Sequence, residues 1–438
     1  MRASLFSPDP YLAQFERLLV KHRARHTRQE PESHGLTLSA LQNHAPELCR
    51  RLAHDVGRGQ YEFAPLSRVE VITDDKQRVI YRAELIDALV LGVMAQRLMQ
   101  LLEPHLRDSV YAYRPERSPK LALTRLRAHL DEHRRQRPDP KQRGLFVLQR
   151  DLAAYGESIP THSESRLWTQ MNDVLAGLQD RGEARVLQSL LTRACRPRVR
   201  LASGEIVVLQ SGLPTGSPIQ QPLANLYLTP LDAALDEAGV SFYARFGDDL
   251  LLIEDDLARF ERGRNILEQQ VSKLELRFNP DKSCDSYFTA PGCPFSGGSG
   301  RPFTPARHIE YLGARVDFEG RFGLKRKRQR ELLSRTRQRI CNTCAVTAPE
   351  ERLSAVARVV KAALFSQVRV ADPLRVALAD WVDDRAQLRQ LDYLIARACA
   401  EAVSERRGVR ALREVRPKDL RAAGLPSLNE LRRRGASR

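Results

Sequence analysis

The spacing of apolar and polar residues predicts the elements of the chain. Between residues 69 and 81, two short apolar runs flank the polar stretch 73–76, which is typical of a β-hairpin. The apolar stretch 84–103 has the length of a helix. Its interspersed polar residues favour a packed helix, since a membrane span needs about 18 consecutive apolar residues. A further apolar strand at 145–148 runs directly into Asp151.

The middle of the chain alternates predicted helices and strands. We expect helices within 163–195, a hairpin near 199–208, and one helix after the Gly/Pro-rich segment 211–218. Two apolar strands, 242–244 and 250–253, flank the letters FGDD. They predict a second hairpin whose turn is acidic.

The two ends of the chain are predicted to be helical. Residues 1–60 have the pattern of amphipathic helices rich in Arg and His, and they carry no motif with a recognisable chemistry. From residue 321 onward the pattern is helical and basic, and residues 321–340 hold nine Lys or Arg against one acidic residue. No repeat of fixed period is present, so a solenoid is not expected.

Composition narrows the class of partner. The chain has 438 residues, of which 42% are hydrophobic, so it can bury a large core. Its 71 Lys and Arg against 54 Asp and Glu give a net charge of +17, which favours a nucleic-acid partner over an anionic membrane. The seven scattered cysteines and the lack of a signal peptide predict a cytoplasmic protein without disulfides. The lone pair Cys341 and Cys344 lacks a second ligand pair and is not expected to bind zinc.

Three aspartates are the strongest chemical feature. Asp151 ends a predicted strand, and Asp248 and Asp249 lie in the turn of a hairpin. If these elements are neighbours, the three carboxylates meet and supply the oxygen ligands that Mg²⁺ prefers, with Mn²⁺ as an alternative. Two ions roughly 3.5–4 Å apart would then activate a nucleotidyl transfer. Alternatively, the adjacent aspartates are turn formers, although charges between two apolar strands are costly without a positive partner.

Seven segments between residues 60 and 320 follow one another in a recognisable order. They are YEFAPLSRVEVITDDKQRVI, VYAYRPERSP, FVLQRDLAAYGESI, SGLPTGSPIQQPLANLYL, YARFGDDLLLI, LRFNPDKS and IEYLGARVDFEG. In this order they resemble the motifs of bacterial reverse transcriptases, the group that includes group II intron, retron and phage-defence enzymes. Seven ordered segments are far more specific than any one of them.

The resemblance implies an α+β protein with the fold of a right-hand polymerase, which has fingers, a split βαβ palm and a helical thumb. The implied domains are an N-terminal helical extension at 1–60, fingers at 61–145 with 160–210 inserted between palm motifs, a palm at 146–320, and a basic helical thumb at 321–438.

The resemblance also assigns roles to single residues. Asp151, Asp248 and Asp249 would be the metal ligands, and Lys282 would stand near the leaving pyrophosphate as a general acid. The residues implied in nucleotide binding are Lys76, Arg78, Arg82, Tyr155, Gly156, Thr215 and Gly216. Those implied in template or primer binding are Arg114, Arg117, Asn225, Tyr311, Leu312 and Gly313. The basic residues would look the same in sequence if they were ordinary solvated charges.

Two positions depart from the pattern of this family. Many relatives carry an aromatic residue five positions after the first catalytic aspartate, where its ring excludes a ribose 2′-hydroxyl, and here this position is Gly156. Many relatives have Gln where this chain has Thr215. These departures leave the selection of the sugar, and the rule by which a template is read, open.

The sequence supports three hypotheses about function. The first is a magnesium-dependent RNA-directed DNA polymerase that uses dNTPs and an RNA template, with a dedicated non-coding RNA as a candidate partner. Residues 340–438 lack a nuclease-like cluster of His, Asn and Cys, which favours a retron-like or antiphage-defence role. The second is a DNA polymerase that works without a template or with an unusual one. The third is a non-catalytic RNA-binding scaffold. The sequence gives no indication of the oligomeric state.

Overall fold

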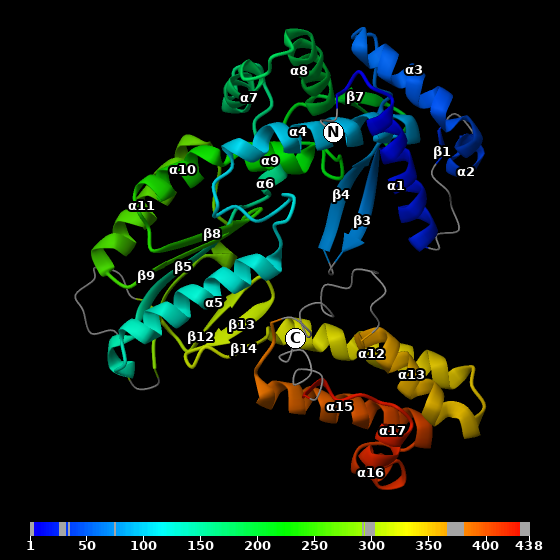
Figure 1. The fold of residues 1–438 in the computed structure, drawn as a ribbon, viewed down its shortest axis with the longest axis vertical. Helices are drawn as coiled ribbons and strands as arrows, with labels where there is room; N and C mark the ends of the chain where they lie inside the picture. Colours follow the sequence, from blue (N-terminus) through cyan, green and yellow to red (C-terminus); the bar gives the residue numbers. More distant parts are fainter. Residues whose placement is uncertain are drawn as a thin grey trace. The chain divides into compact units, whose positions relative to one another are not determined.

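The computed structural model describes residues 4–25, 32–33, 36–73, 76–290, 293, 303–365 and 381–429. The chain divides into two compact units. The first contains residues 1–118 and 148–285, and the second contains residues 119–147 and 286–438. Figure 1 shows the course of the chain through both units.

The first unit contains ten described helices and eight strands. Its helices are α1 (Asp9–Arg25), α2 (Leu38–Leu41), α3 (Ala45–Gly57), α4 (Leu85–Leu102), α6 (Tyr155–Ser158), α7 (Arg166–Ala176), α8 (Arg181–Cys195), α9 (Gln220–Tyr227), α10 (Thr229–Glu237) and α11 (Leu257–Lys273). Its strands are β1 (Glu32–Ser33), β2 (Leu36–Thr37), β3 (Leu66–Thr73), β4 (Lys76–Arg82), β6 (Arg198–Arg200), β7 (Ile206–Val208), β8 (Phe242–Phe246) and β9 (Asp249–Glu254).

The second unit is mostly helical. Its helices are α5 (Pro119–Gln136), α12 (Arg326–Ala345), α13 (Arg352–Phe365), α15 (Arg385–Ser404), α16 (Val409–Glu414) and α17 (Pro417–Ala422). Its strands are β11 (Thr304–Ala306), β12 (His308–Tyr311), β13 (Ala314–Asp317) and β14 (Phe322–Leu324). Two strands, β5 (Leu145–Asp151) and β10 (Cys284–Phe288), have residues in both units.

The largest sheet has the topology expected of a split βαβ core. Its strand order is β11-β10-β5-β9-β8, so the four main strands lie in the order fourth, first, third, second along the chain. The connection from β5 to β8 contains α6, α7, α8 and the β6–β7 hairpin and ends in helices α9 and α10, and α11 connects β9 to β10. This alternation of strands and helices is the ferredoxin-like arrangement. It brings the end of β5 and the β8–β9 hairpin to neighbouring positions in one sheet (Figure 1).

A second sheet confirms two predicted hairpins. It has the order β4-β3-β6-β7. β3 and β4 pair antiparallel from Thr73 opposite Lys76 to Ser67 opposite Arg82. β6 and β7 form the hairpin expected near 199–208, and β6 joins β3 in parallel.

The N-terminal helices are part of the core of the first unit. α1 packs against both α3 and α4, with Leu5, Tyr11 and Phe15 almost fully buried. By length and composition, one helical stretch of the described chain, Leu85–His105, could cross a membrane. However, 67% of its most apolar window is buried inside the fold, as in the core helix of a globular protein.

Two predicted helix boundaries are wrong. The single helix expected after 211–218 is broken into α9 and α10 at Leu228, because Pro230 lies in the first turn of α10, where a missing N–H costs nothing. The helical pattern expected from residue 321 begins only at α12. Before it, Phe322 and Leu324 are fully buried in β14, which pairs with β13, so burial in a sheet prevails over helix propensity.

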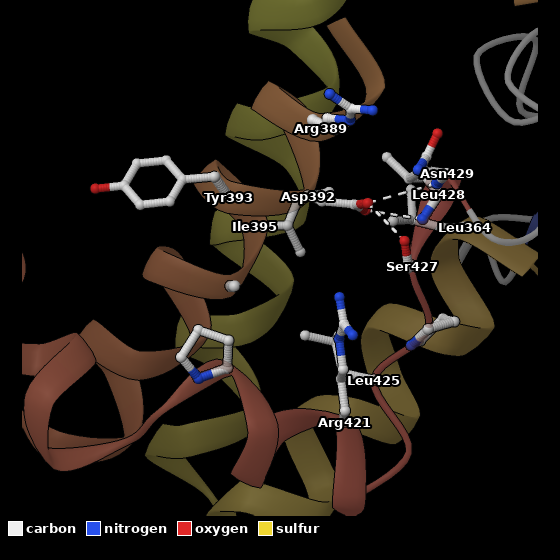
Figure 2. A pocket seen from close by; sticks show the side chains of 13 residues that line it. Leu364, Arg389, Asp392, Tyr393, Ile395, Arg421, Leu425, Ser427, Leu428 and Asn429 are labelled. Carbon is white, nitrogen blue, oxygen red and sulfur yellow. Dashed lines mark hydrogen bonds between the residues drawn. The ribbon is translucent and has the colours of Figure 1, made fainter. Parts of the chain in front are cut away.

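The C-terminal helices enclose a pocket of about 450 Å³ between α13, α15, α17 and the segment that follows α17 (Figure 2). In its wall, Asp392 on α15 accepts hydrogen bonds from the hydroxyl of Ser427 (2.7 Å) and the amide of Leu428 (2.8 Å). This carboxylate therefore holds the C-terminal segment against α15. Arg389 and Arg421 also line the pocket and make it basic.

Candidate active site

The end of β5 fixes Asp151 beside the β8–β9 hairpin. The amide of Leu152 donates a hydrogen bond to the carbonyl of Asp248 (3.2 Å), which ties the two elements together directly after Asp151. On the other side, the amide of Asn279 donates to the carbonyl of Asp151 (2.7 Å). Asp151 is buried, and its side chain is only 7% exposed. Its position is thus set by main-chain contacts from two distant parts of the sequence.

The acidic hairpin has a tight turn of two residues. Phe246 and Asp249 are paired, so the turn consists of Gly247 and Asp248. Gly247 has φ +68°, a conformation that hairpin turns of this length require and that glycine adopts without strain. We expected both aspartates in the turn. Instead, Asp248 is a half-buried turn residue, whereas Asp249 is the exposed first residue of β9.

The three carboxylates and two basic residues share one electrostatic environment. Burial raises the pKa of Asp248, the charge of Asp151 raises it further, and Lys282 and Arg78 act in the opposite direction. Lys282 Nζ lies 2.5 Å from Asp151 Oδ2. Burial alone would lower the pKa of Lys282, but the hydrogen bond to Asp151 and the charges of Asp249 and Asp248 raise it overall. The residues predicted to be catalytic therefore lie close enough to affect one another.

Whether this site suits divalent cations depends on which side-chain atoms could coordinate them. Among the residues that the structure describes, no three His, Cys, Asp or Glu side chains form a group that could hold a metal ion by themselves. Asp151, Asp248 and Asp249 nevertheless offer only carboxylate oxygens, the donors that Mg²⁺ combines with water and substrate phosphate. The ammonium of Lys282 now balances part of their charge. The role of the three aspartates as metal ligands stays a prediction.

A buried ion pair stabilises the β8–β9 hairpin. Arg245 on β8 is fully buried and binds Asp232 on α10 through Nε (2.9 Å) and a terminal nitrogen (2.6 Å). The same guanidinium donates to the side chain of Asn225 (3.0 Å) and to the carbonyl of Gly247 (3.4 Å). Tyr243 adds a hydrogen bond to Asp232 (2.9 Å). The network connects α9 and α10 to Gly247, the residue before Asp248 in the turn.

The β3–β4 hairpin presents Arg78 to the carboxylates. Arg78 is exposed, and its charge acts on Asp248. Ile80 lies on the same face of β4, since side chains alternate along a strand. A Cβ placed on Gly216 would lie 3.6 Å from that of Ile80, and the amide of Tyr81 donates to the carbonyl of Thr215 (2.7 Å). The predicted nucleotide-binding residues Arg78, Thr215 and Gly216 are thus brought together.

Two other predicted phosphate contacts are less well defined. Arg82 is exposed on the same face of β4 as Arg78. Lys76 begins β4 opposite Thr73, but its side chain lies outside the part of the chain that the structure describes.

Three predicted contacts with substrate are replaced by structural roles. Tyr155 is buried, and its hydroxyl donates to the carbonyl of Ala224, so it packs against α9. Arg114 is buried and binds Glu103 (2.7 Å) and main-chain carbonyls, so its guanidinium does not reach a template. Asn225 is buried in the Arg245 network. In each case the hydrogen-bonding groups of the side chain are used inside the fold.

For the remaining predicted template and primer residues, the structure shows the position but not a contact with nucleic acid. Arg117 is half-buried and pairs with Asp108 (2.6 Å). In the second unit, Tyr311 is the buried last residue of β12, and Leu312 and Gly313 form the β12–β13 turn with positive φ. Their predicted role in supporting the primer stays a prediction.

Sequence reasoning missed several residues that build the site. Asn279 donates to Asp151 through its side chain (3.4 Å) as well as its amide. Tyr113 has φ +56°, is 44% exposed, and has its pKa raised by burial and by Asp248. Gln220 contacts the turn at Thr215 and Gly216. Only Arg245 had a signal in the sequence, since a charge in an apolar strand needs a buried partner.

The sequence of the chain matches a known protein family. Residues 74–316, more than half of the chain, match the family described as reverse transcriptase (RNA-dependent DNA polymerase). A comparison with curated proteins gives no match. Among solved structures, an apo telomerase from Candida tropicalis truncated from its C-terminal domain is similar, with 10% identity and a TM-score of 0.45. That match covers 60% of this chain and 55% of the other. Telomerase from Candida albicans in complex with a telomeric RNA fragment has 11% identity and a TM-score of 0.45, over 87% of this chain and 67% of the other.

Proposed function

Because the chain belongs to the reverse transcriptase family, whose members are RNA-dependent DNA polymerases with a right-hand α+β fold, we propose that it extends DNA on an RNA template at Asp151, Asp248 and Asp249. The observation that carries this proposal is the hydrogen bond from Leu152 to Asp248, which places the end of β5 against the acidic turn. Two basic side chains act on these carboxylates: Lys282 interacts with all three, and Arg78 with Asp248.

In the proposed mechanism, each of these residues has a separate role. Two magnesium ions held by the aspartates would stabilise the attacking 3′-oxygen and the leaving phosphate oxygen. Arg78 binds the triphosphate, because a guanidinium matches phosphate oxygens with paired hydrogen bonds. Lys282 holds a proton at Nζ for the leaving pyrophosphate. Arg245 keeps the turn in place through the Gly247 carbonyl.

A primer-extension assay tests the proposed function. Purified protein is incubated with a DNA primer on an RNA template, Mg²⁺ and dNTPs, and the products are sequenced. Products complementary to the RNA support the proposal. Products that appear without added template, and that copy no co-purified RNA, would instead support the template-independent polymerase. If there is no product and RNA binding persists, the RNA-binding scaffold is favoured.

Arg78→Ala should weaken nucleotide binding. The loss of a charge-assisted contact is expected to raise KM for dNTP roughly tenfold or more with a smaller change in kcat. Arg68→Ala is a matched control, because Arg68 lies on the opposite face of the same hairpin and pairs with Glu70 (2.7 Å). Steady-state kinetics with one dNTP measure the effect. Equal KM values for the two variants would remove Arg78 from the site.

Lys282→Gln should slow chemistry more than binding. Loss of a general acid is expected to reduce kcat about 100-fold or more. Because the pKa of Lys282 is raised above its ordinary value, its proton is present throughout the neutral range and is lost only as the pH rises above that value. The wild-type rate should therefore show no alkaline decline from this group near neutral pH. Lys273→Gln, which removes an exposed lysine of α11, is the control in a pH–rate series. A kcat for Lys282→Gln equal to that of Lys273→Gln would argue against the assignment.

We also propose a cytoplasmic enzyme with a retron-like or antiphage-defence role and a dedicated non-coding RNA as partner. Support comes from the order of the seven sequence segments, the net charge of +17 and the seven free cysteines. Sequencing of the RNA that co-purifies with the protein tests the partner. A phage plaque assay with wild type and an aspartate variant tests the role, and equal plaque counts for both and for an empty vector would reject it.

A further inference from the structure

The space next to Gly156 is filled by the side chain of Gln220. Gly156 lies in α6, five positions after Asp151. A Cβ on Gly156 would lie 2.3 Å from Nε2 of Gln220, which is closer than real Cβ atoms come to other heavy atoms. Gly156 is not among the residues with positive φ, so its backbone does not require glycine. The Gln220 amide occupies the place where a side chain on residue 156 would begin, so the amide would have to move to admit one.

The Gln220 amide is held in place by the turn that precedes α9. Its oxygen accepts a hydrogen bond from the amide of Gly216 (3.2 Å), and its nitrogen makes a long contact with the hydroxyl of Thr215 (3.5 Å). Gln220 is half-buried. An amide nitrogen carries two hydrogens, and among the described residues only the Thr215 hydroxyl accepts one.

Gln220 links the turn bonded to β4 with the helix that follows Asp151. The turn at Thr215 is hydrogen-bonded to Tyr81 on β4, the strand that carries Arg78. On the other side, Gln220 touches Gly156 in the helix that follows Asp151. A nucleotide whose phosphates lie between Arg78 and the aspartates would present its sugar to this amide.

We propose that the side-chain amide of Gln220 contacts the sugar of the incoming nucleotide and admits a 2′-hydroxyl. This rests on the proposed polymerase function and deepens it by naming the substrate class. An amide can donate to or accept from a hydroxyl, whereas an aromatic ring at position 156 would exclude the hydroxyl by its bulk. The enzyme therefore accepts ribonucleoside triphosphates alongside deoxyribonucleoside triphosphates.

The test compares Gln220→Leu with Gln221→Leu. The first removes the hydrogen-bonding groups at nearly constant size, and the second changes an exposed neighbour on the same helix. kcat/KM for addition of one nucleotide is measured with GTP and dGTP opposite the same template base. Gln220→Leu should lower the ratio of GTP to dGTP use about 3- to 10-fold, the effect of one hydrogen bond, while Gln221→Leu leaves it unchanged. An equal ratio in all three proteins overturns the proposal.

A second variant and a binding measurement separate the role of Gln220 from effects on folding and from the proposed polymerase activity. Gly156→Phe with Gln220→Ala replaces the amide by a ring, and it should lower the ribonucleotide ratio further while dGTP use persists. The affinities for GTP and dGTP are also measured at equilibrium in Ca²⁺, without turnover. The ratio of the two affinities should rank the wild type and the variants in the same order as the kinetic ratio. If the wild type extends no primer, the polymerase proposal fails, and the binding ratios alone decide the role of Gln220. Binding ratios unaffected by Gln220→Leu would overturn it.

Discussion

Asp248→Asn is expected to abolish nucleotide addition while making the metal-free protein more stable. The rate should fall at least about 1000-fold, because a catalytic metal supplies several kcal/mol of charge stabilisation and each ~1.4 kcal/mol is tenfold in rate. The gain in stability follows from the raised pKa of Asp248, which is caused first by burial and then by Asp151. An uncharged amide of the same size removes that cost.

The dependence of stability on pH gives this prediction a second readout. A carboxyl group with a raised pKa binds its proton more tightly in the folded than in the unfolded protein. The free energy of unfolding should therefore fall as the pH rises from the ordinary value of Asp248 to its raised value, and stay lower above that range. Asp248→Asn should lose this part of the pH dependence.

Primer extension and thermal unfolding with and without Mg²⁺ measure both effects. Mg²⁺ should raise the Tm of the wild type but not that of Asp248→Asn. Asp236→Asn is the control, since Asp236 is an exposed residue of α10 whose side chain forms a surface ion pair with Arg107 (3.5 Å). If Asp248→Asn keeps the activity of this control, Asp248 is not part of the catalytic site.

Arg245→Met is expected to have the largest effect on stability. Burial alone would lower the pKa of Arg245, but the charge of Asp232 and the hydrogen bonds to it raise the pKa. Removing the guanidinium leaves Asp232 buried, charged and without its cation, so the free energy of unfolding should fall by about 3–5 kcal/mol. Unfolding by a chemical denaturant measures this decrease in the free energy of unfolding. A loss below about 1 kcal/mol, the value of a surface pair, would contradict the role of the network.

A double variant separates stability from positioning. Arg245→Met with Asp232→Leu removes both charges, and apolar replacements of a buried pair are often neutral for stability. We expect the double variant to recover much of the lost stability. Its activity should stay low, because the contact from Arg245 to the Gly247 carbonyl is still missing. Full recovery of activity would mean that the network only stabilises the fold.

The sequence predicts those parts of the fold that depend on local pattern. The strand ending at Asp151, the β3–β4 hairpin and the apolar strands around the acidic turn are all present, because alternation and apolar runs specify strands directly. The split βαβ palm follows from the family resemblance, and the observed strand order has this topology. The convergence of Asp151 and Asp248 is a consequence of that order.

The sequence could not predict which polar side chains are used inside the fold. Arg114 and Arg78 both lie within the quoted motif segments, yet Arg114 is buried and paired with Glu103, whereas Arg78 is exposed and its charge acts on Asp248. Burial depends on contacts between distant segments, and the pattern of residues around each arginine does not reveal them. The contact between Gly156 and Gln220 joins residues 64 positions apart and has no local signal for the same reason.

The binding of Mn²⁺ measured by electron paramagnetic resonance tests the shared carboxylate site most directly. Wild type and Asp151→Asn with Asp248→Asn are titrated in the presence of primed RNA and a non-hydrolysable dNTP analogue. The wild type should bind about two ions per chain, and the double variant should lose both at the same concentrations. Equal binding by the two proteins would show that these aspartates do not hold the catalytic metals.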